Sequence, residues 1–294
     1  MEDITIDRAL VRSLLVDQHP DLSGLAIREV EGGWGNIMWR LGDELAVRLP
    51  RFPRAPAARS EQRWLPGMAS RLPLPVPTPV RIGEPSAIFP APWTITRWVA
   101  GVPADHEPIR RPEAAESLAG FLRELHRPAP GDAPVNPTHG GPLARHAKGI
   151  ESWLAVLGAD RRTTAARRVW DDATAAPEWG RAPLWVHGDL HPANVVVADG
   201  TLSGVLDFGE LCAGDPAADL AAAWVLLPEG TAARFVEAYG RADDAMIRRA
   251  RGWAVLRALV LISIGQKWEQ GLPGGKQTWG PAGQHALDRV LAAA

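Results

Sequence analysis

Residues 185–209 read W-V-H-G-D-L-H-P-A-N-V-V-V-A-D-G-T-L-S-G-V-L-D-F-G. Two mainly apolar runs, 195–197 and 202–206, flank a turn at 198–200, and this pattern predicts a β-hairpin. Three side chains that carry oxygen stand around the open end of that hairpin: Asp189, Asn194 and Asp207. Kinase-type phosphoryl transfer requires such a set, because one carboxylate orients the attacking hydroxyl while an amide and a second carboxylate bind Mg²⁺. The stretch therefore predicts a phosphoryl-transfer site.

The composition indicates a chain that can build a large core and carries little net charge. Among 294 residues, 46% are hydrophobic, which is enough for a sizeable core divided between two lobes. The formal net charge is -2, so no basic excess indicates a nucleic-acid partner. The single cysteine, Cys212, excludes an internal disulfide and fits a reducing cytosol.

No segment has the pattern of a signal peptide or of a membrane span. The first residues, M-E-D-I-T-I-D-R, are acidic and lack the basic and apolar regions of a signal peptide. The longest apolar helical pattern, 253–264, contains Arg257 and is shorter than the roughly 20 residues that a bilayer requires. We therefore expect a cytoplasmic protein, monomeric or weakly homodimeric, with neither a membrane nor a nucleic-acid partner.

The N-terminal part of the chain combines helical and strand patterns. Apolar positions at helical spacing predict a helix over 5–18. Between 27 and 49, short β-type runs separated by glycine-containing turns predict three antiparallel strands in a meander. A helix is expected over 57–69, although Pro66 can cut it short. Residues 88–99 return to apolar β-type residues, which completes a sheet-rich region.

Beyond this region nearly all patterns are helical. Apolar stripes or helix-start signals predict helices over about 112–127, 143–157, 162–175, 231–240, 243–269 and 281–293, and one more that opens at Asp215 as its N-cap. The 243–269 helix allows a break. The fold class expected from this layout is α+β, with a small β lobe followed by a large helical lobe.

Seven short motifs, in order along most of the chain, carry a resemblance to a known family. They are G-G-W-G-N at 32–36, A-V-R-L-P-R at 46–51, E-Q-R-W-L at 61–65, R-W-V-A-G at 97–101, H-G-D-L-H-P-A-N at 187–194, L-D-F-G-E at 206–210 and G-D-P-A-A-D-L-A at 214–221. The sequence is similar to the aminoglycoside phosphotransferase family, which are small-molecule kinases. The resemblance implies a protein-kinase-like fold of two lobes: a nucleotide-binding, antiparallel β lobe over 1–98 and a mainly helical, catalytic lobe over 99–294.

The resemblance also implies roles for the residues of the hairpin. Asp189 matches the catalytic aspartate, which accepts or orients the proton of the acceptor hydroxyl. Asn194 and Asp207 match the ligands of Mg²⁺. His187 and Asp219 match residues that support the catalytic loop.

Nucleotide binding is expected in the first lobe, with ATP or GTP as the phosphoryl donor. Arg48 stands where protein kinases carry a lysine that pairs with phosphates, and Glu61 on the next helix is its natural ion-pair partner. The glycine turn can lay backbone amides on phosphates through Gly33, Trp34, Gly35 and Asn36. The hinge that binds the adenine edge is expected at Thr96, Arg97, Trp98 and Val99.

The acceptor is expected to be a small molecule with a hydroxyl group. Five residues separate Gly209 from Asp215, which leaves no room for the activation segment of a protein kinase. The resemblance favours an antibiotic, an aminoglycoside or another sugar-containing one, with resistance by inactivation as the outcome. Candidate substrate-binding residues are Glu210, Asp215, Trp224 and Trp268, although an N-cap role for Asp215 and core packing for the tryptophans fit the pattern as well.

Two other functions remain open at this stage. A metabolite kinase of the same fold, acting on a sugar, an amino alcohol or a nucleoside, would carry the same motifs. A metal-dependent hydrolase could use the H-x-D-x-H pattern of His187, Asp189 and His191, but it would leave the Asp-Phe-Gly element unexplained. An inactive binding module is disfavoured, because none of the three oxygen-bearing residues has been lost.

Overall fold

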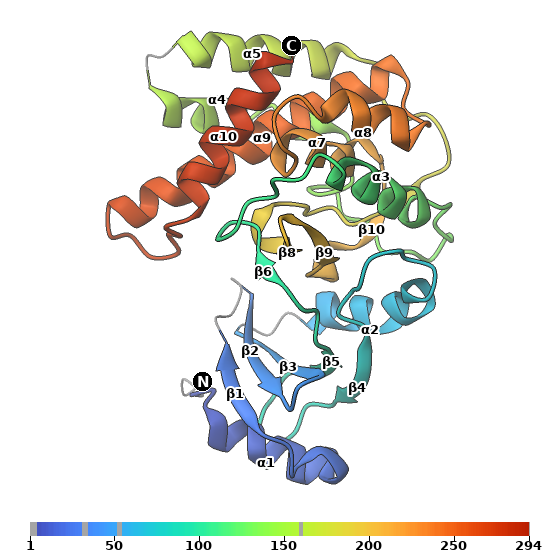
Figure 1. The fold of residues 1–294 in the computed structure, drawn as a ribbon, viewed down its shortest axis with the longest axis vertical. Helices are drawn as coiled ribbons and strands as arrows, with labels where there is room; N and C mark the ends of the chain where they lie inside the picture. Colours follow the sequence, from blue (N-terminus) through green and yellow to red (C-terminus); the bar gives the residue numbers. More distant parts are fainter. Residues whose placement is uncertain (1–4, 31–34, 52–54, 159–160, 294) are drawn as a thin grey trace. The chain divides into compact units, whose positions relative to one another are not determined.

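The structure is a computed structural model that describes residues 5–30, 35–51, 55–158 and 161–293. It divides into two compact units, one formed by residues 1–71 and 75–99 and the other by 72–74 and 100–294. We call them the N-terminal and the C-terminal unit and describe each by itself (Figure 1).

A five-stranded antiparallel sheet forms the N-terminal unit. Its strands are β1 Ile27–Val30, β2 Asn36–Leu41, β3 Leu45–Pro50, β4 Pro79–Gly83 and β5 Trp93–Arg97, in the order β1-β2-β3-β5-β4. The first three strands pair in sequence, which confirms the predicted meander. The turn between β2 and β3 contains Gly42 at φ +60, a backbone conformation that glycine adopts without strain.

Two helices accompany this sheet. Helix α1, Arg8–Gln18, begins where Asp7 Oδ1 accepts a 2.8 Å hydrogen bond from the Leu10 N–H. Its apolar stripe packs into one buried cluster with side chains of the sheet, including Trp39 and Trp93. A short 3-10 turn, Pro20–Leu22, follows α1. Helix α2, Ala55–Ala69, continues through Pro66, so the early break that the sequence allowed does not occur.

The C-terminal unit contains the predicted hairpin, which confirms that element. Strands β8 Val195–Ala198 and β9 Thr201–Val205 pair antiparallel, and β6 Val102–Pro103 joins β8 on its other edge. Asp199 and Gly200 in the turn have φ of 51 and 76, and positive values at both central residues are typical of a type I′ hairpin. A second pair, β7 Leu184–Val186 with β10 Cys212–Gly214, lies on either side of this hairpin in the sequence.

Helices and the loops that connect them make up the rest of the C-terminal unit. The helices are α3 Ala114–Leu125, α4 Ile150–Leu154, α5 Arg161–Ala175, α6 Ala217–Leu220, α7 Ala222–Val225, α8 Ala232–Tyr239, α9 Asp244–Glu269 and α10 Trp279–Ala292, with 3-10 turns at Leu143–His146, Ala155–Leu157, Pro192–Asn194 and Phe208–Glu210. The prediction of one helix over 143–157 is wrong, because two 3-10 turns flank a single short α-helix there. The helix expected from Asp215 is divided into α6 and α7.

Helix α9 is the centre of the C-terminal unit. Its 26 residues form one continuous helix that packs against α5, α6 and α10, and it is buried along most of its length. Helix α10 approaches α9 closely where Gly265 faces Gly280, since a Cβ on Gly265 would lie 2.3 Å from the Gly280 Cα. This central helix carries Arg249 and Arg257 into the interior.

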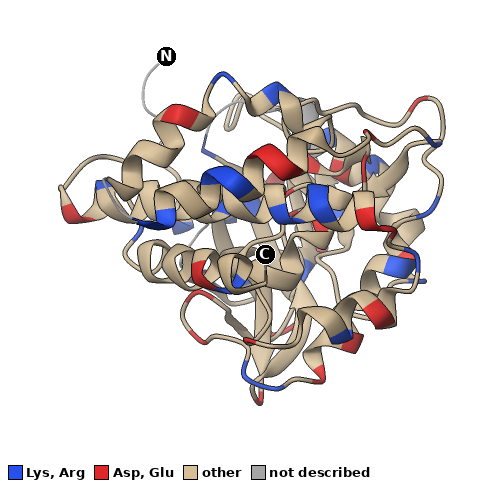
Figure 2. Ribbon diagram, turned by 90° about the horizontal axis from the view of Figure 1, so that it is seen from above, with Lys and Arg blue, Asp and Glu red and all other residues tan. Residues whose placement is uncertain are grey.

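The charged residues are of both signs throughout. Figure 2 shows basic and acidic segments interspersed along the helices, which agrees with the net charge of -2. Within the described residues, no helix combines the length and the apolar character needed to cross a membrane.

Candidate active site

The predicted catalytic loop, residues 187–194, and Asp207 meet at the open end of the β8–β9 hairpin. The Leu206 N–H donates to the Asn194 carbonyl over 2.8 Å, which places Asn194 and Asp207 beside each other where the two strands part. The Asn194 amide then reaches back to Asp189, because Nδ2 donates to the Asp189 carbonyl over 2.9 Å and to Oδ2 over 3.2 Å. Three residues that are separate in the sequence therefore form one cluster.

Asp189 is held on both carboxylate oxygens. Oδ1 accepts a 3.2 Å hydrogen bond from Arg257 Nη1, and Oδ2 lies 3.6 Å from His191 Nε2. Burial alone would raise the pKa of this carboxyl, but the hydrogen bond of His191 and the electrostatic effect of the side chains around the carboxylate outweigh burial and hold the pKa well below its usual range. Those side chains are His191, Arg257 and His139. With its side chain 30% exposed, Asp189 is an ionised carboxylate that a ligand can reach.

Asn194 and Asp207 offer the oxygens that Mg²⁺ prefers. Among the described residues, both hydrogen bonds of the Asn194 side chain leave from Nδ2, and its amide oxygen is left for another partner. Asp207 has φ 57 and ψ 77, a left-handed conformation that is uncommon outside glycine, and its Oδ1 accepts a hydrogen bond from the Gly209 N–H over 3.3 Å. Residues with uncommon backbone conformations cluster at functional sites. The hard oxygen donors of this pair fit a magnesium ion.

His187 and Asp219 brace the loop from inside. The fully buried Asp219 carboxylate accepts the N–H groups of His187 and Gly188 over 2.7 and 2.9 Å. His187 Nε2 donates to the Leu206 carbonyl over 2.8 Å, and Nδ1 accepts the Asp189 N–H over 3.2 Å. Burial lowers the pKa of His187 despite the carboxylates around it, so the imidazole is neutral.

Two further side chains extend this support. His126 Nε2 lies 3.1 Å from Asp219 Oδ2, and His126 Nδ1 lies 2.9 Å from the Tyr239 hydroxyl. Burial would raise the pKa of Asp219, but the hydrogen bond and charge of His126 outweigh it and lower the pKa. Neither His126 nor Tyr239 was selected by the sequence interpretation, although both sit at the ends of predicted helices.

In the N-terminal unit, Arg48 and Glu61 form an ion pair through Nη1 and Oε1. The two side chains are only 9% and 8% exposed. A buried pair of this kind joins β3 to α2 and fixes the direction of the guanidinium.

The model of the phosphotransferase enzyme family matches residues 26–259, which include the catalytic loop. The chain belongs to the phosphotransferase enzyme family. Its N-terminal sheet, its helical C-terminal unit and its motifs agree with the predicted family and with the predicted α+β class.

Two curated relatives share part of the sequence. A viomycin phosphotransferase of Streptomyces vinaceus is 30% identical over 189 residues, which are 59% of this chain and 63% of that protein. An aminoglycoside 3'-phosphotransferase of Escherichia coli is 29% identical over 136 residues, 44% of this chain and 49% of the relative. The matched stretches therefore span less than two thirds of either relative.

Solved structures share the fold over nearly the whole chain. Aminoglycoside 2'-phosphotransferase-IIIa in complex with GDP has a TM-score of 0.73 at 20% identity, covering 98% of this chain and 99% of that one. A macrolide 2'-phosphotransferase of Brachybacterium faecium has a TM-score of 0.59 at 22% identity, covering 92% and 97%. These likenesses confirm the protein-kinase-like fold class.

In this family member, the expected hinge lies at the end of β5. The backbone N–H groups of Arg97 and Trp98 are bound to the carbonyls of Thr78 and Glu44, over 2.9 and 2.7 Å. For the Val99 N–H, no partner lies among the described residues. Thr96 is fully buried within the sheet. A nucleotide contact at Val99 therefore stays a prediction.

The glycine turn is described only in part. Gly33 and Trp34 lie outside the described residues. The Gly35 carbonyl accepts the Arg51 N–H over 2.9 Å, and Asn36 opens β2 opposite Pro50. The turn is thus fastened at its C-terminal side to the end of β3.

The four candidate substrate residues lie in different surroundings. Glu210 accepts a 2.6 Å hydrogen bond from Asn136 Nδ2, and its Cβ lies next to Gly188 in the catalytic loop. Trp224 is buried in the core, whereas Trp268 is 53% exposed at the end of α9. Glu210 therefore lies beside Gly188, the residue before Asp189.

Asp215 already has an internal partner. Arg249 binds both oxygens of its carboxylate, from Nε over 2.7 Å and from Nη2 over 3.2 Å, and the pair lines a cavity of about 270 Å³. Asp215 Oδ1 also accepts the Ala217 N–H over 3.0 Å, as the N-cap interpretation expected. It follows Gly214, which pairs with Leu184 at the end of β7 farthest from Asp189. A substrate contact for Asp215 stays a prediction and would compete with Arg249.

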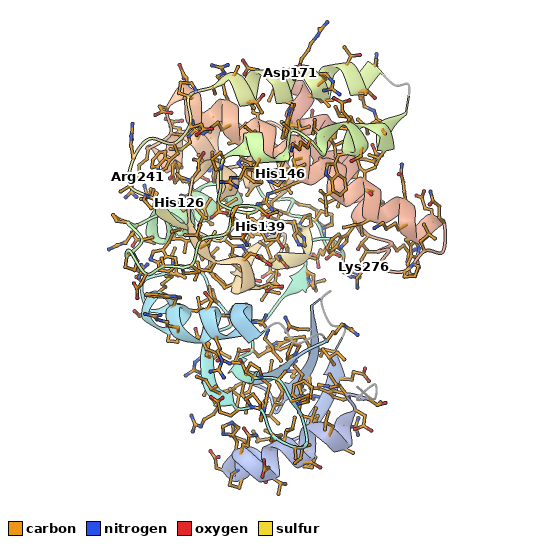
Figure 3. All side chains as sticks on the ribbon, turned by 180° about the vertical axis from the view of Figure 1, so that it is seen from behind. His126, His139, His146, Asp171, Arg241 and Lys276 are labelled. Atoms are coloured by element: carbon orange, nitrogen blue, oxygen red, sulfur yellow. The ribbon has the colours of Figure 1, made fainter. Side chains whose placement is uncertain are left out.

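The sequence interpretation also passed over two residues that contact the catalytic loop. Arg257 binds Asp189, and His139 Nδ1 donates to the Gly188 carbonyl over 3.1 Å. Figure 3 shows His126, His139 and His146 within the C-terminal unit, whereas Asp171 and Arg241 lie at its margins. A signal existed for Arg257, since it is the one charge in the apolar run 253–264.

Proposed function

We propose that this protein is a nucleotide- and Mg²⁺-dependent O-phosphotransferase that phosphorylates a hydroxyl group of a small molecule. The observation that carries the proposal is the cluster of Asp189, Asn194 and Asp207 at the open end of one hairpin, joined by the hydrogen bonds of Asn194. Membership of the phosphotransferase enzyme family supports it.

Asp189 would orient the acceptor hydroxyl. Phosphoryl transfer passes through a loose transition state in which little proton transfer is needed early, so a positioned, ionised carboxylate suffices. The low pKa of Asp189 fits orientation better than strong general-base catalysis.

Asn194 and Asp207 would hold the magnesium ion through their side-chain oxygens. When bound, the ion would neutralise negative charge on the phosphate groups of the nucleotide. The tie between Leu206 and the Asn194 carbonyl keeps the two ligands at a fixed separation, which suits the strict geometry of Mg²⁺.

The nucleotide would bind in the N-terminal unit. Arg48, directed by Glu61, offers a planar guanidinium to phosphate oxygens, and the Val99 N–H offers a donor to the base. Gly33, Trp34, Gly35 and Asn36 would cover the phosphates. Solved proteins of the same fold hold GDP or ADP, so we propose ATP or GTP as donor.

The acceptor that we propose is an antibiotic, with resistance by inactivation as the result. The relatives are a viomycin and an aminoglycoside phosphotransferase, and one solved structure of this fold contains kanamycin. We further propose that the protein acts in the cytoplasm as a monomer or weak homodimer. Residues 1–98 would serve the nucleotide and 99–294 the acceptor.

The geometry disfavours the hydrolase alternative. Both ring nitrogens of His187 are engaged, with Leu206 and with Asp189, so neither can bind a metal without breaking the loop. Within the described residues, no three His, Cys, Asp or Glu side chains group closely enough to hold a metal ion. A metal-dependent hydrolase needs at least three such side chains as ligands of its metal ion.

The test is an incubation with Mg²⁺, with ATP or GTP, and with a panel that contains viomycin, kanamycin, a macrolide, sugars, amino alcohols and nucleosides. We expect release of nucleoside diphosphate, and a gain of one phosphate in the mass of an antibiotic. Turnover confined to a sugar, an amino alcohol or a nucleoside would assign a metabolite kinase instead. Hydrolysis of a substrate without nucleotide would contradict the proposal.

A further inference from the structure

Arg257 reaches the catalytic loop from the middle of α9. Its Nη1 donates to Asp189 Oδ1 over 3.2 Å, and its Nη2 donates to the carbonyl of Gly188, the residue before. We propose that Arg257 is a positioning residue for phosphoryl transfer, which fixes the peptide and the carboxylate of Asp189 together. This inference rests on the function proposed above.

The burial of Arg257 is costly for folding. The residue is 9% exposed, and its Nε is buried without a hydrogen-bond partner among the described residues. Its guanidinium carbon lies 5.8 Å from the centre of the Trp253 ring. An unpaired buried donor lowers stability, and an apolar side chain of similar volume would often be tolerated better at such a position. A gain in stability therefore does not explain this arginine, whereas a role at Asp189 does.

The contacts divide the two carboxylate oxygens between separate elements. Arg257 from α9 binds Oδ1, while Asn194 and His191 lie on the Oδ2 side. The Arg257 guanidinium donates one hydrogen bond to the Asp189 carboxylate and one to the Gly188 carbonyl. These two contacts restrict rotation of the Asp189 side chain. Each carboxylate oxygen can accept about two hydrogen bonds, so a site for the acceptor hydroxyl remains beside Arg257.

Other charged groups near the loop do not duplicate this contact. His139 Nδ1 donates to the same Gly188 carbonyl but not to the carboxylate. Asp219 accepts a hydrogen bond from the Gly188 N–H, which belongs to the peptide group before the one that Arg257 contacts. Among the described residues, Arg257 makes the one hydrogen bond to Asp189 Oδ1. Its removal would free that oxygen while the loop backbone keeps its other supports.

The experiment compares Arg257→Met, Arg257→Lys and the control Arg248→Met. Arg248 lies on the same helix and pairs with Asp172 at the surface. For Arg257→Met we expect kcat to fall about 100-fold, the effect of a misplaced catalytic group. The nucleotide KM should stay within about twofold, because the residues proposed for the nucleotide lie on other elements. Arg257→Lys should restore part of kcat, and Arg248→Met should match the parent protein.

A double-mutant cycle separates positioning from a general loss of structure. If Arg257 acts through Asp189, then adding Arg257→Met to Asp189→Asn costs little beyond Asp189→Asn alone. For each variant we would measure phosphorylation of the accepted antibiotic, hydrolysis of the nucleotide with water as acceptor, and the melting temperature. The inference would be overturned if the two substitutions lowered kcat independently, so that their fold-changes multiplied in the double variant. An unchanged kcat in Arg257→Met, or a loss of kcat that unfolding explains, would overturn it as well. Full turnover by Asp189→Asn, or no nucleotide turnover by the parent protein, would instead overturn the proposed function.

Discussion

At the scale of single residues, the distribution of charge around Asp189 determines what that carboxylate can do. Arg257, His191 and His139 keep it ionised in a site that is only partly open to water. Electrostatic groups fixed in advance supply much of the rate in enzymes of this kind, because they need no reorganisation during the reaction.

Asp189→Asn should lower kcat by at least about 100-fold, since the amide keeps the shape but loses the charge that orients the hydroxyl. Nucleotide KM should change little. Steady-state kinetics with the accepted antibiotic check this, with Asp172→Asn on the exposed part of α5 as the control. Retention of full kcat would remove Asp189 from the reaction.

Cys212 provides a second prediction at this scale. Burial raises the pKa of its thiol to about 12, and Gly140 is in close contact with the sulfur. The reactive thiolate is therefore scarce and shielded in the native protein. We expect no reaction with a disulfide reagent at about pH 8, and one equivalent of reaction once the protein is unfolded in denaturant. Rapid labelling of the native protein would contradict the buried position.

At the scale of elements, the catalytic loop depends on a buried chain that links four segments. Asp219 on α6 binds the loop, His126 at the end of α3 binds Asp219, and Tyr239 on α8 binds His126. Loss of one member removes a hydrogen-bond partner from its buried neighbour, which is a large cost.

The lowered pKa of Asp219 predicts an acid-sensitive fold. A carboxyl with a folded pKa below its unfolded value stabilises the protein above the unfolded pKa of about 4, and this stabilisation is lost as pH falls towards the folded pKa. Asp219→Asn should be less stable at neutral pH and should lose less stability than the parent between about pH 5 and pH 3. Denaturant unfolding at several pH values measures this, with Asp171→Asn at the surface as the control. Parallel profiles would contradict it.

Local patterns predicted some elements well and others poorly. The hairpin followed from two apolar runs and the Asp-Gly turn between them, and the structure shows positive φ values at Asp199 and Gly200. The prediction of one helix over 143–157 was wrong, because the sequence pattern alone does not show where a segment that packs against α9 is interrupted by 3-10 turns. The break at Pro66 did not occur, so tertiary packing outweighed the local preference there.

The contacts of the site depend on long-range packing. Asp189, Asn194 and Asp207 lie within one short stretch, and so their grouping could be inferred from their spacing. Arg257 is 68 residues from Asp189 in the sequence, and its partner is decided by where α9 packs. His126 and Tyr239 lie 113 residues apart and meet for the same reason.

At the scale of the whole molecule, we expect a buried charge pair of the N-terminal unit, Arg48 and Glu61, to serve the proposed reaction. Arg48 and Glu61 are the buried counterparts of an exposed pair in the same unit, Arg28 and Asp43, which are 54% and 86% exposed. Exposed pairs contribute little to stability, whereas breaking a buried pair costs far more. The two pairs therefore make a matched comparison.

Glu61→Gln should raise the nucleotide KM by about tenfold and lower the melting temperature, because Arg48 loses the carboxylate that directs it. Arg48→Lys should bind nucleotide less tightly than the parent, since a lysine cannot grip a phosphate with two parallel hydrogen bonds. Asp43→Asn, the control, should change neither quantity. Titration with ATP and with GTP checks both variants, and an unchanged KM for both would separate this pair from the nucleotide.

The segment that follows Asp207 is fastened at both ends. Strand β10 is paired residue by residue with β7, and the Asp215 N–H donates to the Gly140 carbonyl over 3.0 Å. A protein kinase at rest withdraws its activation segment, but here no slack chain exists between Gly209 and Asp215 to be withdrawn. The proposed reaction would then run whenever nucleotide and acceptor are present. The rate of the reaction in the cell would then depend on how much of the protein the cell makes and on how much acceptor enters.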